Sequence, residues 1–421
     1  MQTLKTFITT YITQLREFDV NSDYFCLVDT IHTLFDRGPP LSRKRIVRIP
    51  WVIINVCTVL QACCMIIQFI STLIQDSIDI DEFIMVFNQT FILTITVFRG
   101  GCFAYHRHSI QQLKKFINSR VCLWDNVEAF EMRKATYRRN IKYMAIFQLT
   151  CILNAIGWIS TEFWKAEVLQ IPFLHDNIPK RLEFWIKLMY ALLYHSWSVL
   201  VYVSVTQFGT ILNSLRTELK IIALQFETLF ESVVTNYVVR KEDLSSLNQT
   251  EADAFWKELA ITFKSAISHH VSFIRQYELL KKVSRLNFFM LLVSAAVIIT
   301  INTLIFITDR SITQIPLQLT ACQFMFETYL CCTMMDTLQT ENKRIAEYVY
   351  VIDWLSVCRR TSDSQRKSAK CIRQNVLLLQ LQIHEGLKIR AGNMFTVERE
   401  TFANLMRVVY SLLTFIMGQT G

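Results

Sequence analysis

The fold is decided by the stretch Leu286-Asn-Phe-Phe-Met-Leu-Leu-Val-Ser-Ala-Ala-Val-Ile-Ile-Thr-Ile-Asn-Thr-Leu-Ile-Phe-Ile-Thr308. It contains no charged side chain from end to end. A helix of about 20 predominantly apolar residues is long enough to cross the hydrocarbon core of a bilayer. The stretch therefore predicts a membrane-spanning helix, and similar stretches elsewhere in the chain can be identified by the same criterion.

Six more apolar stretches lie on either side of it. The seven predicted spans cover residues 50–74, 83–105, 143–164, 182–211, 286–308, 315–338 and 402–417. Composition agrees, because 52% of the 421 residues are hydrophobic and only 19% are charged, whereas soluble domains average about 25% charged residues. Gly and Pro are scarce, with 9 and 6 copies, which argues against a turn-rich β protein. We therefore expect an all-α membrane protein with seven transmembrane helices in a lipid bilayer.

The basic residues are distributed unevenly around these spans. Most of the 44 Lys and Arg residues lie before the first span and in the linkers 106–142, 212–285 and 339–401. Because cytoplasmic loops retain Lys and Arg, the pattern predicts a cytoplasmic N-terminus and an extracellular C-terminus. The same bias accounts for most of the net charge of +9, which weakens the case for a nucleic-acid partner.

The predicted spans divide the chain into four parts. Residues 1–48 form a cytoplasmic segment, 49–338 hold the first six spans with the long linker 212–285, 339–394 form cytoplasmic helices, and 395–421 contain the seventh helix. The seventh span is the shortest and includes Arg407. An ionisable residue within a span usually faces protein or water, so this helix is expected to face a pore or a partner rather than lipid.

Apolar stripes run through the cytoplasmic linkers at helical spacing. They are Leu215, Leu219, Ile222, Phe226, Leu229 and Val233; then Trp256, Ala260, Phe263, Ile267, Val271 and Ile274; and, within a helix over 370–387, Val376, Leu379, Ile383 and Leu387. Such stripes need partners. They are expected to extend the spans into a common cytoplasmic bundle, and pattern alone leaves two alternatives equally open: packing within the chain, or packing against neighbouring subunits.

Motifs of catalysis and metal binding are missing from the sequence. It has no GxSxG, GxxxxGK[ST], HExxH or GxGxxG motif. Its 12 Cys residues include no CxxC pair, so a zinc or redox site has no support. His269 and His270 are interpreted as a solvated pair on a polar helix surface. We predict that the chain is not an enzyme and uses neither cofactor nor metal.

Four short elements in the final third carry a family resemblance. In order, they are Cys332 followed by Ala346, Tyr350 and Trp354 at four-residue spacing; Ala391-Gly-Asn-Met-Phe395; Glu400-Thr-Phe402; and Tyr410-Ser411. Together they resemble the corresponding motifs of insect odorant receptors. Met335 is a departure, since many members of the family have Gly there. The long insertion before the fifth span that is typical of the obligate co-receptor (Orco) is missing, so the chain resembles a ligand-selective tuning subunit.

The resemblance implies a function. It implies a ligand-gated, non-selective cation channel, in which tuning and co-receptor subunits form a heterotetramer around one pore, joined through the cytoplasmic anchor helices. The last span would line the pore. A small volatile organic odorant would bind in the outer half of the bundle, between spans two, three, four and six. The expected location is the plasma membrane of olfactory neuron dendrites.

Two other classes remain as alternatives. A gustatory-type channel subunit is the nearer, but its family usually ends with a Thr-Tyr…Gln-Phe pattern, which Val409 before Tyr410 breaks. A seven-helix G-protein-coupled receptor is the other, and it requires the opposite orientation in the membrane. An extracellular N-terminus would support it.

Helical spacing and the direction of each span predict which residues face the ligand. They are Phe87, Asn88 and Phe91 in the second span; Asn154, Trp158 and Thr161 in the third; Tyr190, Tyr194 and His195 in the fourth; and Leu319, Cys322, Gln323 and Phe326 in the sixth. A mostly apolar and aromatic lining with a few polar groups suits a small volatile ligand. The alternative for each residue is an ordinary contact between helices.

The last span has one face with the spacing expected of a pore lining. The predicted stripe is Asn404, Val408, Ser411, Phe415, Gly418 and Gln419. Phe415 is the candidate hydrophobic gate, closing the pore by dewetting, and Gln419 would form a polar outer rim. The alternative is that this stripe packs on neighbouring spans.

Overall fold

The computed structural model describes residues 18–19, 22–29, 45–74, 80–120, 122–123, 125–160, 179–236, 249–308, 314–351 and 366–420. The main helices are α3 (Arg45–Ile74), α4 (Ile80–Tyr105), α5 (Arg107–Ser119), α6 (Val127–Ser160), α7 (Lys180–Asn236), α8 (Gln249–Thr308), α9 (Ile315–Val351), α11 (Arg366–Glu385) and α12 (Arg399–Thr420). Two short strands, β1 (Arg390–Ala391) and β2 (Phe395–Thr396), pair antiparallel before α12. Apart from short turns and connecting segments, the described chain is otherwise helical, which confirms the predicted all-α fold class.

Each predicted span lies in a helix over the residues that the structure describes, which leaves out residues 161–164 of the third span. By length and composition, α3, α4, α6, α8 and α12 contain segments apolar enough to cross a membrane. α9 is less apolar because it carries Gln318, Gln323 and Glu327 within the predicted span. Gln323 and Glu327 line an internal cavity instead of the outer surface. The polar residues of α9 therefore reflect its central position in the bundle.

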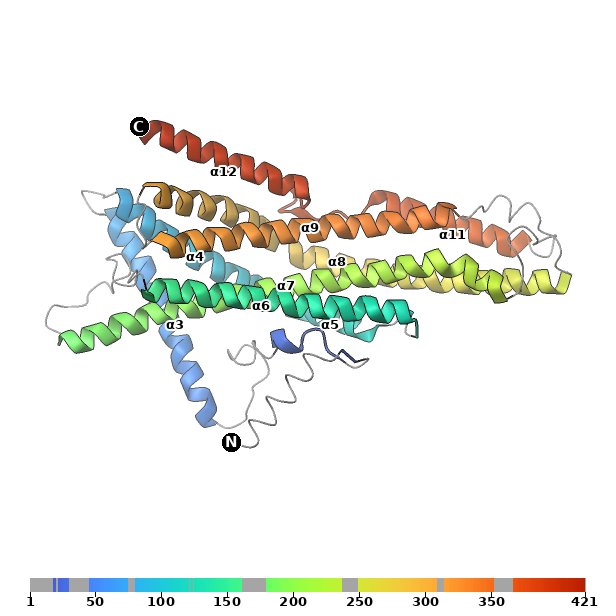
Figure 1. Ribbon diagram of the computed structural model, residues 1–421, viewed down its shortest axis with the longest axis horizontal. Helices are drawn as coiled ribbons and strands as arrows, with labels where there is room; N and C mark the ends of the chain where they lie inside the picture. Colours follow the sequence, from blue (N-terminus) through green and yellow to red (C-terminus); the bar gives the residue numbers. More distant parts are fainter. Residues whose placement is uncertain are drawn as a thin grey trace.

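α7 and α8 continue well beyond their predicted spans. They are 57 and 60 residues long and run without interruption from the membrane-spanning part into the linker 212–285. Figure 1 shows α6, α7, α8 and α9 lying along the long axis of the molecule, with α3, α4 and α12 at one end and α5 and α11 towards the other. The prediction that the spans extend into a shared helical bundle is confirmed.

The main hydrophobic core lies in this extension. The stripe of α7 is buried, with Leu215 and Leu219 fully inaccessible and Phe226 packed edge-on against Phe263 of α8 at 6.1 Å between ring centroids. The α11 stripe belongs to the same cluster of buried apolar side chains, and Leu379 is one of its members. Burying each such side chain stabilises the fold by about 1.5–3 kcal/mol. These stripes therefore pack within the chain, which was one of the two alternatives left open.

The membrane-spanning half has smaller apolar clusters and, in addition, buried polar contacts between its helices. Arg99 of α4 forms a two-point ion pair with Glu327 of α9, and both side chains are 5% exposed. Asn88 of α4 donates a 2.6 Å hydrogen bond to Asn302 of α8. Apolar burial does not drive helices together in lipid, so buried polar pairs and close packing specify which helices meet.

His270 corrects the interpretation of the histidine pair. Its side chain is fully buried, and Nε2 lies 3.2 Å from Oδ1 of Asn342 on α9. His269 is half-buried, with Nδ1 2.9 Å from Oε1 of Gln225. The pair is not a solvated surface because α8 is the central helix of the extension and contacts α5, α7, α9 and α11. Burial lowers the pKa of His270 below its usual value.

A tight turn links β1 to β2 and positions the start of α12. Gly392 has a φ of +58° and Asn393 a φ of +67°, values that glycine and asparagine tolerate best. The Gly392 amide donates a 3.0 Å hydrogen bond to the carbonyl of Arg285 on α8. Ala391, beside it, is fully buried. The Ala391–Phe395 motif thus fastens the entry of α12 to α8.

Candidate ligand-binding site

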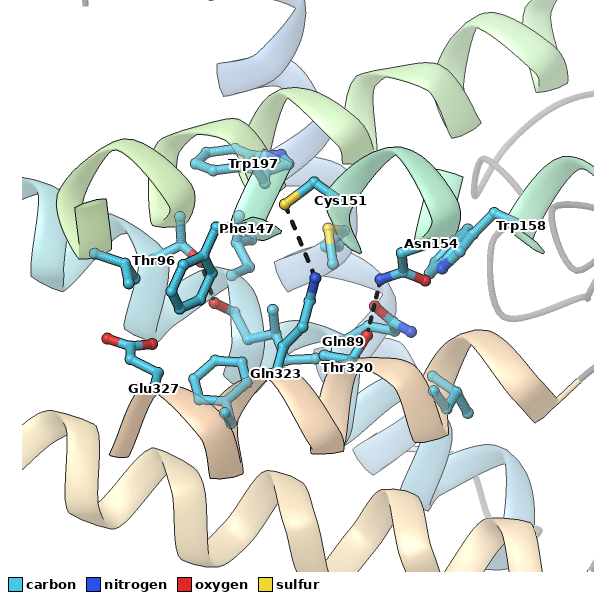
Figure 2. A pocket seen from close by; sticks show the side chains of 16 residues that line it. Gln89, Thr96, Phe147, Cys151, Asn154, Trp158, Trp197, Thr320, Gln323 and Glu327 are labelled. Carbon is cyan, nitrogen blue, oxygen red and sulfur yellow. Dashed lines mark hydrogen bonds between the residues drawn. The ribbon is translucent and has the colours of Figure 1, made fainter. Parts of the chain in front are cut away.

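An internal cavity of about 100 Å³ lies in the membrane-spanning half, between α3, α4, α6, α7 and α9. It is lined by Met65, Gln89, Ile92, Leu93, Thr96, Phe147, Cys151, Asn154, Trp158, Trp197, Val205, Leu317, Thr320, Gln323, Phe324 and Glu327. Figure 2 shows Trp158 and Glu327 at its opposite ends, with Gln323 reaching across from α9 towards α6. A single water needs only about 10–15 Å³ on this measure, so the cavity has room for a small organic molecule.

Aromatic and aliphatic side chains make most of its wall. Trp158 and Trp197 are 8% and 9% exposed, and Phe324 is 6% exposed. Trp197 donates through Nε1 to Oε1 of Gln61, at 3.2 Å, which holds the indole in place. Such a wall contributes dispersion and apolar burial to a ligand and sets its shape, while the few polar groups set its orientation.

Asn154 is the polar group best placed to orient a ligand. Its Nδ2 donates to Oγ1 of Thr320 at 3.1 Å, and that hydroxyl in turn donates to the carbonyl of Pro316 at 3.0 Å. The chain of donors fixes the amide orientation and leaves Oδ1 as an acceptor without a partner among the described residues. A buried acceptor without a partner costs about 1–3 kcal/mol. A ligand that donates a hydrogen bond would remove that cost.

Gln323 supplies the complementary donor. Among the described residues, its Nε2 has a hydrogen bond only to the thiol of Cys151, at 3.9 Å, and a sulfur acceptor is weak. The amide donor is therefore available to a stronger acceptor, such as a hydroxyl or carbonyl oxygen. Gln323 and Asn154 together offer one donor and one acceptor in the same cavity.

The Arg99–Glu327 pair closes the cavity at one end. Glu327 lines it directly, but both of its carboxylate oxygens accept from the Arg99 guanidinium. The two charges offset each other at close range, so the site has no uncompensated charge. An isolated ion would be strongly disfavoured here, and the arrangement therefore favours a neutral ligand.

The predicted ligand-facing residues are only partly brought together. Asn154, Trp158 and Gln323 line the cavity. Phe87 and Phe91 lie on another face of α4, where they stack on each other at 5.7 Å, and Asn88 turns towards α8. The cavity-facing side of α4 begins one position further on, at Gln89.

The other predicted residues lie elsewhere. Tyr190 is buried, and its carbonyl accepts from Gln61 of α3. Leu319, Cys322 and Phe326 are on the exposed side of α9. Thr161 falls outside the described residues, as do the side chains of Tyr194 and His195. Ligand contact by any of these residues stays a prediction.

The missed lining residues carry a recognisable signal. On α9 the polar residues Thr320, Gln323 and Glu327 follow one another at steps of three and four, and on α4 Gln89 and Thr96 are two turns apart. Polar residues at helical spacing within a span mark the side that faces the interior. Arg99 and Glu327, opposite charges in two separate spans, could have been paired on the same grounds.

The predicted pore stripe of α12 is exposed in the single chain. Val408 and Phe415 are 52% and 65% exposed, and Asn404, Ser411 and Gly418 are exposed as well, while the side chain of Gln419 is not described. Val409 on the opposite face is buried against α8 and α9. From Asn404 to Gly418 the stripe therefore does not pack on the described part of its own chain, and its lining of a pore stays a prediction.

Comparison with known proteins gives a consistent result. A family model described as 7tm odorant receptor matches residues 79–410. Among solved structures, the insect olfactory receptor OR5 from Machilis hrabei in complex with eugenol is similar, with a TM-score of 0.69 and 12% identity over 94% of this chain and 98% of that one. A second solved structure of the same receptor gives a TM-score of 0.67 and 12% identity, over 94% of this chain and 99% of that one. Curated protein sequences yield no match.

Proposed function

Since this chain belongs to the 7tm odorant receptor family, we propose that it is the odorant-binding, tuning subunit of a ligand-gated, non-selective cation channel. The observation that carries the proposal is the internal cavity with Asn154 Oδ1 unpartnered in a mostly apolar wall. A mostly apolar cavity without uncompensated charge suits a small volatile molecule. The proposal is favoured over the gustatory-type and G-protein-coupled alternatives by the family match.

The chain is oriented with its N-terminus in the cytoplasm and its C-terminus outside. The distribution of Lys and Arg supports this orientation, and it makes residues 1–48, the linker 212–285 and residues 339–394 cytoplasmic. The bundle formed by the ends of α7, α8 and α9 with α5 and α11 is then the anchor region. Residues 395–421 carry the pore-lining helix, and the protein resides in the plasma membrane of olfactory neurons.

The ligand is a neutral volatile with one hydroxyl group on an apolar skeleton. Its hydroxyl hydrogen is donated to Asn154 Oδ1, and its oxygen accepts from Gln323 Nε2. The offset charges of Arg99 and Glu327 support a neutral molecule rather than an amine or an acid. The similar receptor from Machilis hrabei was solved with eugenol, and by analogy a phenol or alcohol of comparable size is a reasonable first ligand for this chain.

Channel assembly requires co-receptor subunits and places α12 at the pore. The exposed stripe of α12 supports this arrangement, because its polar residues Asn404 and Ser411 are exposed in the single chain and polar residues of a span usually face protein or water rather than lipid. Four subunits around one axis would bring Phe415 of each α12 together as a hydrophobic constriction. Ligand binding would then favour the arrangement of spans in which the constriction is wider.

Matched ligand pairs test the proposal. The chain is co-expressed with the co-receptor in oocytes, and currents are recorded for volatile alcohols and for the methyl ethers of the same skeletons. The ethers cannot donate a hydrogen bond, so we expect about 10-fold higher half-maximal concentrations for them. In Asn154→Leu this difference should disappear, because the acceptor is lost.

Two outcomes would contradict the proposal at different levels. Failure of every volatile to evoke current with the co-receptor present, despite surface expression, would refute the channel function. An alcohol-to-ether ratio that is unchanged in Asn154→Leu would instead refute the role of Asn154 alone. Leu153→Ala, which shortens an exposed side chain on the neighbouring position of α6, is the control for expression.

A further inference from the structure

A second cavity, of about 800 Å³, opens on the surface where α8 begins its membrane-spanning part. Its wall comes from α8, the junction of α4 with α5, the end of α11, and the segment between α11 and β2. We call it the basic cleft. Its lining includes Lys281, Lys282, Arg285, Lys388 and Arg390 together with His106, Glu278, Glu385 and Asn393. It is of the size that ligand sites usually have.

The basic cleft carries an excess of positive charge. Five Lys and Arg side chains line it against two carboxylates. Lys281 is 3.5 Å from Glu278, in a contact where both side chains are about half exposed. Lys282, Arg285 and Lys388 have no carboxylate within ion-pair distance in the described part of the chain. Like charges held together without partners raise the local concentration of an anion.

Backbone structure holds these charges in place. After Gly386, which has a φ of +73°, residues 387 to 391 alternate between the interior and the surface. Leu387 and Ile389 are buried, so Lys388 and Arg390 share the outer face. The hydrogen bond from the Gly392 amide to the Arg285 carbonyl ties this segment to α8. The cleft is therefore formed by anchored backbone rather than by a loose cluster of lysines.

The basic cleft also lies directly beside apolar surface. Arg285 immediately precedes Leu286, the first residue of the predicted fifth span, which is 43% exposed. His106 immediately follows Tyr105, which ends α4 and is 85% exposed. A lipid whose headgroup occupied the cleft would have apolar surface next to it for its acyl chains. Basic pockets on the cytoplasmic side of membrane helices are suited to phosphorylated lipid headgroups.

We propose that the basic cleft binds a multiply phosphorylated inositol headgroup of the inner leaflet. The proposal rests on the cytoplasmic orientation given under the proposed function. The phosphates are bound by Lys282 and Arg285 from α8 and by Lys388 from the segment that leads to α12. Such a headgroup bridges α8 and the entry of α12, and it therefore restricts the movement of the helix proposed to line the pore.

Lipid binding is measured on the purified full chain by native mass spectrometry in detergent. The probes are phosphatidylinositol 4,5-bisphosphate, phosphatidylcholine and the soluble headgroup inositol 1,4,5-trisphosphate. We expect preferential binding of the phosphorylated lipid over phosphatidylcholine. In the triple variant Lys282→Gln/Arg285→Gln/Lys388→Gln, affinity should fall about 100-fold, since each basic residue near a membrane contributes roughly fivefold.

A matched variant separates the cleft from general charge. Lys257→Gln/Lys264→Gln/Arg373→Gln removes the same charge from exposed positions that do not line the cleft, and it should bind as the original chain does. Circular dichroism and size-exclusion profiles confirm that both triple variants are folded. Equal losses in the two variants would overturn the proposal, as would equal binding of the two lipids or no loss in the cleft variant.

The remaining arms identify the source of the phosphates and separate this site from the channel function. Binding of inositol trisphosphate as tightly as the lipid would overturn the leaflet source and assign the cleft to a soluble phosphate. Because binding is measured without current, a chain that binds phosphoinositide but gives no odorant response would retain this site while the proposed function fails. The reverse result would refute this site only.

Discussion

Replacing Gly392 by Ala should destabilise the protein, because the turn before α12 has no room for a Cβ atom. A Cβ built at this position would lie 2.7 Å from Cδ2 and 3.0 Å from Cγ of Phe289 on α8. These ring atoms are close to the backbone of Phe289 and cannot move away without changing its rotamer. The φ of +58° adds a second penalty for any residue with a side chain.

The two penalties can be given magnitudes. The left-handed conformation costs an L-residue about 1–2 kcal/mol, and overpacking by one methyl group costs about 1–3 kcal/mol. Gly392→Ala should therefore lower the free energy of unfolding by about 2–5 kcal/mol. For a chain of 421 residues that unfolds as one unit, this corresponds to a fall of about 2–6 °C in apparent melting temperature.

Thermal stability in detergent, followed by fluorescence-detected size exclusion, is a suitable assay. Gly101→Ala is the matched control, since a Cβ on this glycine of α4 meets nothing within 4 Å. It should leave the melting temperature unchanged or raise it slightly, because Ala is favoured over Gly in a helix by up to about 1 kcal/mol.

A double-mutant cycle with Phe289→Ala separates the two penalties. Removal of the ring should recover the steric part of the loss and leave the backbone part, so the combined variant should be more stable than the sum of the single losses predicts. Strict additivity, or a Gly392→Ala protein as stable as the original chain, would refute the close-approach explanation of the motif.

Three further predictions follow from buried and exposed side chains. Arg99→Gln should cost about 3–5 kcal/mol because it leaves the Glu327 carboxylate buried and unpaired, and Arg99→Gln/Glu327→Gln should recover most of that loss; equal melting temperatures of the single and double variants would contradict the ion pair. Phe415→Ala, co-expressed with the co-receptor, should increase ligand-free current, whereas Leu412→Ala on the same helix should not; unchanged leak in both would remove Phe415 as a gate. Burial holds the pKa of His270 below 6.5, so the unfolded chain takes up a proton there before the folded chain does, and stability present above about pH 6.5 is lost as the pH falls below it. His270→Gln should flatten that part of the acid dependence between about pH 7 and 5; an identical slope in both proteins would count against it.

The helices of this protein follow from the sequence because their signal is local. Apolar length identifies the spans, and the spacing of Leu215, Leu219 and Ile222 identifies a buried face that the structure contains. The second span ends at Tyr105 and the sixth begins at Ile315, as α4 and α9 do. Neither boundary depends on knowing which helix packs against which.

The helix faces that line the cavity cannot be predicted from the sequence in the same way. Helical spacing groups Phe87 with Phe91, but it does not specify which neighbour this face meets. Asn88 donates through Nδ2 to Asn302, a residue 214 positions away, and that pairing fixes the rotation of α4 so that Gln89 faces the cavity. His270 was misinterpreted for a related reason, since a helix surrounded by others buries its polar face too.

The unbroken length of α7 and α8 constrains how the receptor can move. At 1.5 Å per residue, helices of 57 and 60 residues are each about 85–90 Å long. A tilt of only about 5° around one end would carry the other end sideways by roughly 8 Å, which the densely packed far end does not permit. These two helices therefore keep a fixed position, and motion triggered at the ligand must pass through shorter helices such as α12, which is fastened to α8 at its start and is exposed along most of its length.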